Sequence, residues 1–329
     1  MIDHARSGLW RYHRSFPFDI EHTVTLGEPV TPLIPATIGG LSVLAKLEGV
    51  LPTGSFKDRG MAVLVSWLRE RGVTHAVEDS SGNAAASIAG YAARAGIGCT
   101  VFAPANASPG KLVQAAAFGA TVMPIAGSRD DVAHAAEIAA LEPGGAYATH
   151  NWHPLFVEGV KTWAFEVWEQ LGFEFPDAII APAGSGSVIL GAMHAFGELG
   201  GRPRLYAAQA AACAPLVAAL RAGSDDTAPF ERRASVAEGI MIANPVRGRA
   251  ILTALRSSGG DAITVDEPDI AHALFDAAHQ GIYCEPTSAT AWAAASHLIE
   301  RGEIGVNERV VIVLTGNGLK TTQTIGNLL

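Results

Sequence analysis

Cysteine and charge are both scarce in this 329-residue chain, and each shortage excludes a class of protein. The three cysteines are an odd number without C-x-x-C spacing, so we expect buried thiols in a reduced, cytoplasmic protein and no disulfide framework. Charged residues make up 17% of the chain and hydrophobic ones 49%, which argues for a large core and against disorder. No apolar run approaches the roughly 18 residues that span a bilayer, and the first residues hold no apolar export signal.

A basic surface is also missing. The net charge of −9 argues against nucleic acid and against anionic membranes as partners. The length gives a prior of about two domains. We therefore expect a cytoplasmic protein of two domains whose partner is a small molecule.

Short apolar stretches alternate with alanine-rich stretches of helical spacing along most of the chain. This alternation predicts an α/β fold with mainly parallel, open sheets flanked by helices. The order is interrupted near Val50 and near His150, where we place the domain junctions. The strands are expected at 43–47, 99–103, 121–125, 178–182, 205–209 and 310–314, and the helices at 61–71, 84–95, 109–118, 130–141, 158–171 and 188–199.

One lysine lies between a small-residue turn and a helical run, in the segment Pro52 to Gly60. A lysine that forms a covalent bond to a carbonyl carbon must lose its proton near neutral pH, and burial beside other cations lowers its pKa. Arg59 and the backbone amides of the helix start could serve near a phosphate. We interpret Lys57 as the residue that holds pyridoxal phosphate.

Two further strand-to-helix turns stand where open α/β sheets place ligands. Ser80, Ser81, Gly82 and Asn83 open a helix with hydroxyls and amides that suit a carboxylate or a phosphate. The run 183–187, Ala-Gly-Ser-Gly-Ser, can hold a phosphate with backbone amides. Each loop alone is explained at least as well by close packing, but the two loops and the lysine together favour a ligand site.

The chain resembles the fold-type II pyridoxal-phosphate enzymes, and among them the threonine synthase group. The lysine motif from Pro52 to Gly60 matches that group residue for residue, and the resemblance extends in order over nearly the whole chain. The other matching motifs are Leu9-Trp10-Arg11-Tyr12, Thr31-Pro32-Leu33, Ser81-Gly82-Asn83, Glu158-Gly159 with Lys161-Thr162, Asn244-Pro245, Cys284-Glu285-Pro286 with Ser288, and Thr315-Gly316-Asn317-Gly318.

The resemblance implies a role for each matching position. Lys57 would carry pyridoxal 5'-phosphate covalently and move protons at the substrate Cα, and Asn83 would bond the cofactor's phenolic oxygen. Thr315 would bond the pyridine nitrogen, and Glu238 to Ile240 would line the ring. The phosphate would be held by Gly184, Ser185, Gly186, Ser187 and Val188, and the substrate by Ser80, Ser81, Gly82 and His153.

The resemblance also implies an architecture. Residues 1–50 and 150–329 would form a larger cofactor-binding domain, and 51–149 a smaller mobile domain that carries the loop from Ser80 to Asn83. The cofactor would bind in the cleft between domains, and two copies would form a homodimer. Closure of the smaller domain over the substrate carboxylate would exclude water.

A hydroxyl at position 315 has a chemical consequence. It cannot stabilise a protonated pyridine as an aspartate would, so the ring should be a weaker electron sink. A weak sink favours prompt expulsion of a leaving group. Thr315 therefore suits elimination and replacement better than transamination.

Four changes, at five positions near the expected substrate pocket, depart from the threonine synthase pattern. Phe156 stands where an arginine would grip the phosphate of homoserine phosphate, and an aromatic ring cannot replace that cation. The other departures are Ser185 and Ser187 in place of asparagines, Ala84 in place of threonine and Thr321 in place of aspartate. Whether homoserine phosphate is the substrate stays open.

The pair His150 and His153 has three interpretations. An H-x-x-H pair can bind a metal, but no third or fourth ligand stands at a suitable spacing, so no metal is predicted. Both rings could pack at the domain junction with Trp152. Either histidine could instead serve as a general acid for a departing hydroxyl or amine.

We expect a pyridoxal-phosphate-dependent carbon–oxygen lyase that acts on a small amino acid by elimination or replacement at Cβ or Cγ. The alternatives are a dehydratase-like β-eliminase, a β-replacement synthase that does not use homoserine phosphate, and a non-catalytic relative. A nucleotide-binding protein is disfavoured because the loop 184–187 lacks G-x-x-x-x-G-K-[ST] spacing.

Overall fold

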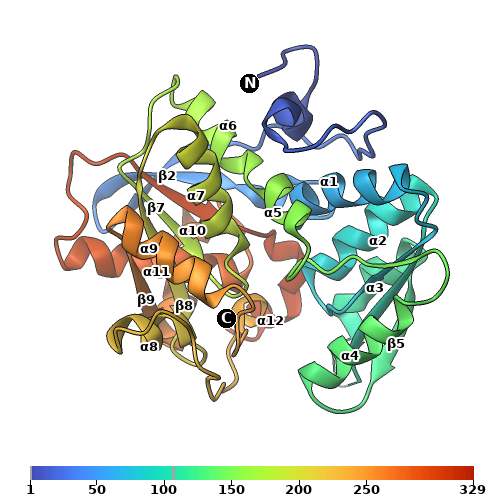
Figure 1. The fold of residues 1–329 in the computed structure, drawn as a ribbon. Helices are drawn as coiled ribbons and strands as arrows, with labels where there is room; N and C mark the ends of the chain where they lie inside the picture. Colours follow the sequence, from blue (N-terminus) through green and yellow to red (C-terminus); the bar gives the residue numbers. More distant parts are fainter. Residues whose placement is uncertain (1, 106, 108) are drawn as a thin grey trace. The chain divides into compact units, whose positions relative to one another are not determined.

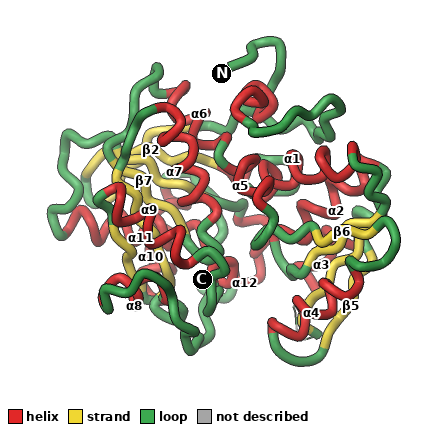
Figure 2. The backbone as a smooth tube through the Cα atoms, viewed as in Figure 1, coloured by secondary structure: helices red, strands yellow, loops and turns green. Residues whose placement is uncertain are grey.

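The computed structural model describes residues 2–105, 107 and 109–329, and these fall into two compact units. Unit 1 comprises Met1–Val30 and Leu51–Thr162, and unit 2 comprises Thr31–Val50 and Trp163–Leu329. Strands and helices alternate within each unit (Figures 1 and 2), which confirms the predicted α/β class. The units differ from the predicted domains in the residues before 31 and between 150 and 162, and the domain assignment with its mobile smaller domain stays a prediction.

Unit 1 is built on a four-stranded parallel sheet with the order β5-β4-β3-β6. One face is covered by α4 (Arg129–Ala139), whose Val132 and Ala136 pack on Val77 and Phe102. Helices α2 (Asn83–Ala95) and α3 (Pro109–Ala117) follow β3 and β4 and pack on the sheet as well. The strands are β3 (His75–Glu78), β4 (Gly98–Pro104), β5 (Thr121–Ile125) and β6 (Gly145–Tyr147).

Two further helices of unit 1 pack unusually closely. Helix α1 (Lys57–Glu70) is buried along most of its length and contacts α2 and α5 (Pro154–Val160). A Cβ atom on Gly159 would overlap the Arg59 carbonyl, and one on Gly60 would overlap the Phe156 ring. Glycine at both positions therefore brings the backbones of α1 and α5 together. The predicted helix 158–171 is two helices, α5 and α6 (Thr162–Gln170), which meet at Lys161.

Unit 2 contains a six-stranded sheet with the order β1-β2-β10-β7-β8-β9. All neighbouring strands are parallel except β1 and β2, which form an antiparallel pair at one edge. The strands are β1 (Leu33–Ile38), β2 (Leu41–Leu47), β7 (Ala178–Pro182), β8 (Arg204–Ala210), β9 (Asp261–Val265) and β10 (Val310–Leu314). Both β7 and β10 are buried at every residue, as expected for central parallel strands.

Helices flank this sheet. Residues of α10 (Glu267–His279) and α11 (Pro286–Glu300) form one core cluster with alternate residues of the strands. Helices α7 (Ser187–Leu199) and α9 (Gly248–Ser258) contact β7, β8 and β9. The remaining helices are α8 (Pro215–Arg221), α12 (Thr322–Gly326) and the short 3-10 helices Gly8–Ser15, Glu48–Val50, Glu238–Ile240 and Gly318–Thr321. In the described part of the chain, no helix is both long and apolar enough to cross a membrane.

The three cysteines are free and buried, as the sequence predicts. Burial raises the pKa of Cys99 and the pKa of Cys284 to about 12. Both thiols therefore stay protonated at neutral pH.

Unit 2 also contains a fully buried ion pair. Lys46 on β2 and Glu166 on α6 have no exposed side-chain surface, and the Lys46 Nζ lies 2.8 Å from the Glu166 Oε2. The ammonium also donates to the Thr31 carbonyl (2.9 Å) and to the Gln170 Oε1 (2.8 Å). Removal of one partner from such a pair strongly destabilises the folded protein, because the other charge is left unpaired in the interior.

We expect Lys46→Met to lower the free energy of unfolding by about 3–5 kcal/mol, measured by urea denaturation. The double variant Lys46→Met/Glu166→Leu should recover much of that loss because it removes both charges of the pair. A loss below about 1 kcal/mol in the single variant would contradict the burial of this pair.

Candidate active site

The lysine turn is fixed by one carboxylate. Asp58, which is fully buried, accepts hydrogen bonds from the Thr53 backbone N–H (2.7 Å) and the Thr53 hydroxyl (2.5 Å). Its Oδ1 also accepts a hydrogen bond from the Ser87 hydroxyl on α2 (2.6 Å). Lys57 is the first residue of α1, and Asn83 is the first residue of α2. The contact between Asp58 and Ser87 thus joins the two helices close to both residues.

Lys57 lies among aromatic rings. Its Nζ is 4.6 Å from the centroid of the Phe56 ring and 5.4 Å from that of Phe156. The side chain is half-buried, and Phe156 is fully buried. From the sequence we expect cationic neighbours around the Lys57 amine. The candidate is Arg59, two residues after Lys57. The Arg59 guanidinium is buried and donates to the Thr162 Oγ1 (3.1 Å).

The predicted substrate loop connects β3 with α2. Its four residues, Ser80, Ser81, Gly82 and Asn83, are all half-buried, and the Ser80 hydroxyl accepts a hydrogen bond from the Gly82 N–H (3.3 Å). The loop ends at the N-terminus of a 13-residue helix, where backbone N–H groups favour an anion. The geometry therefore suits the carboxylate of an amino acid, and that role stays a prediction.

Two acidic residues directly before this loop are not singled out by the sequence pattern. Glu78 accepts from His150, at 3.2 Å from the backbone N–H and with 2.9 Å between the Glu78 Oε1 and the His150 Nδ1. Asp79 accepts from the Arg129 guanidinium (2.6 Å) and from the Thr149 hydroxyl (2.9 Å). Both carboxyl groups are buried, so this cluster lies in the interior of unit 1.

Burial dominates the electrostatics of the two acids. It raises the pKa of Glu78 to about 7, against the opposing charge of Arg129, hydrogen bonds and the Lys57 ammonium. Burial and the neighbouring Glu78 carboxylate raise the pKa of Asp79, which Arg129 opposes. Glu78 consequently exchanges its proton near neutral pH.

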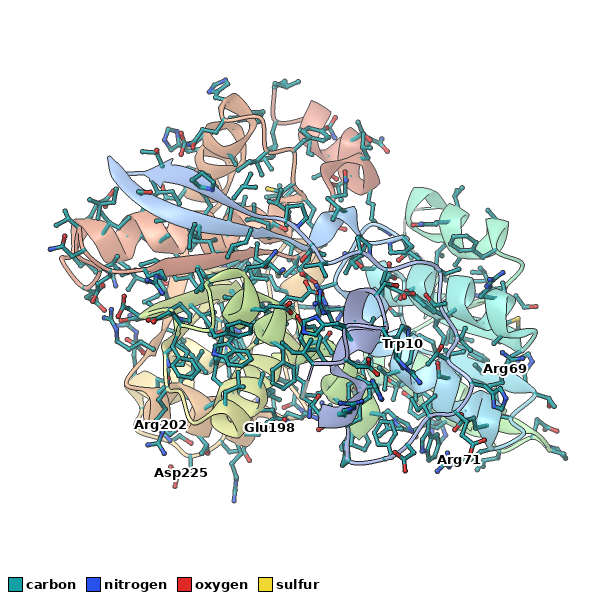
Figure 3. The ribbon with its side chains drawn as sticks, turned by 90° about the horizontal axis from the view of Figure 1, so that it is seen from above. Trp10, Arg69, Arg71, Glu198, Arg202 and Asp225 are labelled. Atoms are coloured by element: carbon teal, nitrogen blue, oxygen red, sulfur yellow. The ribbon has the colours of Figure 1, made fainter. Side chains whose placement is uncertain are left out.

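His153 lies differently from His150. Its Nδ1 accepts from the Leu155 N–H (3.3 Å) as the N-cap of α5, and its ring centroid is 5.5 Å from that of Trp67. Trp67 is ten residues after Lys57 on α1, which corresponds to about 15 Å along a helix. Figure 3 shows Arg69 and Arg71 at this far end of α1. A substrate contact of His153 stays a prediction. Of the two histidines, it is His150 that is buried and bonded to an acid, Glu78.

The glycine-rich loop of unit 2 joins β7 to α7. A Cβ on Gly184 would lie 2.9 Å from the Ile240 Cα, so Glu238–Ile240 packs directly on this loop. Gly186 is the N-cap of α7 and has a φ of 72°, which favours glycine. The Ser187 hydroxyl is buried and has no hydrogen-bond partner among the described residues, while Ser185 is half-buried and Val188 buried.

These features of the loop fit a phosphate group. A buried hydroxyl without a partner costs free energy unless a ligand satisfies it. Here it stands in the first turn of a 13-residue helix, beside a run of backbone amides that attract an anion. The residues present therefore fit the phosphate of pyridoxal 5'-phosphate, with Gly184 to Val188 as its predicted ligands.

Thr315 follows β10 and is buried. Its hydroxyl donates to the Glu285 Oε1 (3.1 Å) and lies 3.2 Å from the Ser288 Oγ, which accepts from the Gly316 N–H (3.1 Å). Glu285 and Ser288 belong to the motifs that carry the resemblance, but the sequence alone gives them no role. The predicted bond from Thr315 to a pyridine nitrogen would require its proton to turn away from Glu285.

The fold and the residues of these loops define a fold-type II pyridoxal-phosphate enzyme. Residues 24–316 match the family model described as pyridoxal-phosphate dependent enzyme, and the chain belongs to that family. It is 37% identical to threonine synthase of Methanocaldococcus jannaschii over 95% of this chain and 80% of the relative. It is 38% identical to threonine synthase of Methanosarcina acetivorans over 96% of this chain and 81% of the relative.

Solved structures agree. The processed form of threonine deaminase isoform 2 from Solanum lycopersicum is 22% identical, with a TM-score of 0.77 over 90% of this chain and 87% of the other. Maize serine racemase, at 22% identity and a TM-score of 0.78 over 91% and 92% of the two chains, shows the same fold. The resemblance, the cofactor and the class predicted from the sequence, a pyridoxal-phosphate-dependent lyase similar to threonine synthases, are confirmed.

We expect Ser187→Ala to weaken cofactor binding because one charge-assisted hydrogen bond to the phosphate is lost. The loss should be about 1.5–3 kcal/mol, or roughly 10- to 100-fold in Kd, measured by titrating cofactor-free protein. Ser257→Ala, an exposed serine of the same unit, is the control. Equal affinities in the two variants would contradict the phosphate role.

We expect Glu78→Gln to flatten the pH dependence of stability. Because folding raises the pKa of Glu78 from 4.5 to about 7, the folded protein binds a proton that the unfolded chain releases between these values. Glu78 thus lowers the stability as pH rises through this window, by up to about 3 kcal/mol in total. Urea unfolding from pH 5 to 8 should show this decline in the wild type, in the exposed control Glu142→Gln, and not in Glu78→Gln.

Proposed function

We propose that this protein is a pyridoxal-phosphate-dependent lyase that eliminates or replaces a substituent at Cβ or Cγ of a small amino acid without a phosphate group. The amino acids that fit are serine, threonine and 2,3-diaminopropionate. The single observation that carries the proposal is the environment of Lys57, which lies close to two phenyl rings and within range of the Glu78 charge.

A phosphorylated substrate fits this environment poorly. By the family resemblance, Phe156 stands where an arginine would bind a phosphate dianion, and its ring is buried against α1. The nearby acids Glu78 and Asp79 add negative charge in their ionised forms, which Arg129 partly offsets at Asp79. A dianion beside buried carboxylates is unfavourable at short range. A neutral hydroxyl or a protonated amine avoids that repulsion.

The roles of the residues follow from their positions. When bound, the cofactor supplies an electron sink for the charge that develops at the substrate Cα. Gly184 to Val188 would hold its phosphate, and Lys57 would hold it covalently. The Lys57 amine, once released, would accept the Cα proton, while the amides and hydroxyls of Ser80 to Asn83 would bind the substrate carboxylate. Asp58 keeps Lys57 at the start of α1 by fixing the turn before it.

A second function has its own support. The relatives at 37% and 38% identity are named threonine synthases and match this chain over 95% of its length or more. Threonine formation from homoserine phosphate is therefore the alternative reaction. The homodimer and the cytoplasmic location rest on the family resemblance and on composition and remain proposals.

The test incubates the purified enzyme with serine, threonine, 2,3-diaminopropionate, phosphoserine and homoserine phosphate, and measures 2-oxo acid, ammonia and threonine. We expect 2-oxo acid and ammonia from one or more of the first three and no threonine from homoserine phosphate. Efficient threonine formation would establish the alternative reaction, and no product from any substrate would support a non-catalytic relative.

Variants at Lys57 provide the control for covalent chemistry. Lys57→Ala and Lys57→Arg should both lose the reducible link to the cofactor, so borohydride treatment and peptide mass mapping should label position 57 only in the wild type. Arginine keeps the positive charge, so its failure separates the reactive amine from charge alone. A label elsewhere in the chain would overturn the assignment of Lys57.

A further inference from the structure

The pair formed by Glu78 and His150 has the geometry of an acid–base device. The Glu78 Oε1 and the His150 Nδ1 are 2.9 Å apart, and the Glu78 Oε2 accepts the His150 backbone N–H at 3.2 Å. Both residues are buried, Glu78 fully and His150 with 8% of its surface exposed. A carboxylate bonded to one ring nitrogen fixes the orientation of the ring and makes the other nitrogen, Nε2, the atom that exchanges protons.

The surrounding contacts hold this pair rigidly. Asp79 follows Glu78 and accepts from the Thr149 hydroxyl, while Thr149 precedes His150. Arg129 on α4 binds the same Asp79 carboxylate at 2.6 Å. Two neighbouring pairs of residues are therefore bonded side by side: Glu78 with His150, and Asp79 with Thr149. The ring of His150 has little freedom to leave Glu78.

Phe156 connects this pair with the lysine. Its ring centroid is 5.8 Å from that of His150 and 5.4 Å from the Lys57 Nζ. Lys57 and His150 thus contact the same phenyl ring, within one compact unit of the chain. When Lys57 removes the proton from the substrate Cα, the β-substituent on the adjacent Cβ would lie on the side of a group beside the same ring.

We propose that His150 is a catalytic acid that donates the proton from its Nε2 to the departing group, and that Glu78 is the residue that positions it. This inference rests on the proposed function and names the chemical class of the leaving group: a hydroxyl or an amine, which must be protonated to depart. In the step, Lys57 takes the Cα proton and the C–H electron pair becomes the Cα–Cβ double bond. The bond from Cβ to the substituent breaks with its electron pair on the substituent, which takes the His150 proton and departs as water or ammonia.

The charges around Glu78 support a proton held near neutral pH. The titratable groups that face it are His150, its chain neighbour Asp79, and Lys57, Cys99, Arg129 and Tyr147 from α1, β4, α4 and β6. Burial favours the protonated acid, whereas Arg129 and Lys57 favour the carboxylate.

The test compares two substrates that differ in the leaving group. Serine loses hydroxide, which needs a proton, whereas β-chloroalanine loses chloride, which needs none. We expect His150→Gln to lower kcat for serine by about 10²- to 10⁴-fold and kcat for β-chloroalanine by less than about 5-fold. His150→Asn should show the same selectivity, and His134→Gln, an exposed histidine on α4, should leave both rates unchanged.

The positioning role of Glu78 has a separate readout. Nitrogen-15 shifts of the His150 ring should report a proton on Nδ1 bonded to Glu78, and the loss of that state in Glu78→Gln. The pH profile of kcat for serine should change in Glu78→Gln, while the profile for β-chloroalanine should not. Cofactor absorbance and melting temperature establish that each variant is folded and loaded.

The outcomes separate the two proposals. If the wild type eliminates both substrates and the His150 variants lose both rates equally, or lose neither, His150 is no proton donor and the inference fails alone. If the wild type eliminates neither of these substrates and neither threonine nor 2,3-diaminopropionate, the proposed function itself fails, and the inference fails with it. A selective loss for serine would establish the assignment.

Discussion

One buried carboxylate, that of Asp58, fixes the turn before Lys57 and joins it to the neighbouring helix. Asp58 accepts hydrogen bonds from the Thr53 N–H and hydroxyl in the turn before the lysine and from the Ser87 hydroxyl on the neighbouring helix. Such donors stabilise a buried carboxylate that would otherwise be costly to place in the interior. Because Asp58 follows Lys57 directly, the same bonds fix the position of the Lys57 backbone and the packing of α1 against the start of α2. Loss of this anchor would affect the lysine and the start of α2 at once.

Two buried carboxyl groups, Glu166 and Glu78, have partners of different kinds. In unit 2, Lys46 and Glu166 lie fully buried as an ion pair at 2.8 Å, with further acceptors around the ammonium. In unit 1, Glu78 is equally buried, but its ion-pair partner is an imidazole that can be neutral. A permanent cation keeps a buried carboxylate charged, whereas an imidazole allows the proton to move. The first arrangement is structural, and the second can exchange protons with a substrate.

The sequence predicts much of this structure where the signals are local. Strands β5, β7 and β10 have the predicted bounds, and Lys57, Asn83 and Ser187 all stand at helix starts as expected. Helix α11 is absent from the predicted elements because it is buried nearly all round, so its apolar residues show no amphipathic periodicity. The helix expected over 158–171 is two helices, and the close packing of Gly159 in the first of them on α1 is a tertiary contact that the local sequence pattern does not contain.

The contacts within the site are beyond local signals. Glu78 and His150 are 72 residues apart, and only the parallel pairing of β3 with β6 brings their segments together. The histidine pair in the sequence gives no reason to prefer one ring, and the structure separates them by burial and by partner. Glu285 is visible as part of a motif, yet its bond to Thr315 depends on how the end of β10 meets the start of α11.

The burial of the thiols has a practical consequence. A thiol reacts with alkylating agents and oxidants as the thiolate, and burial keeps Cys99 and Cys284 protonated and out of reach of such reagents. One of them lies in each unit. Reaction at Cys99 therefore reports local opening of unit 1, and reaction at Cys284 reports local opening of unit 2. The rate of thiol labelling can thus measure the opening of each unit separately.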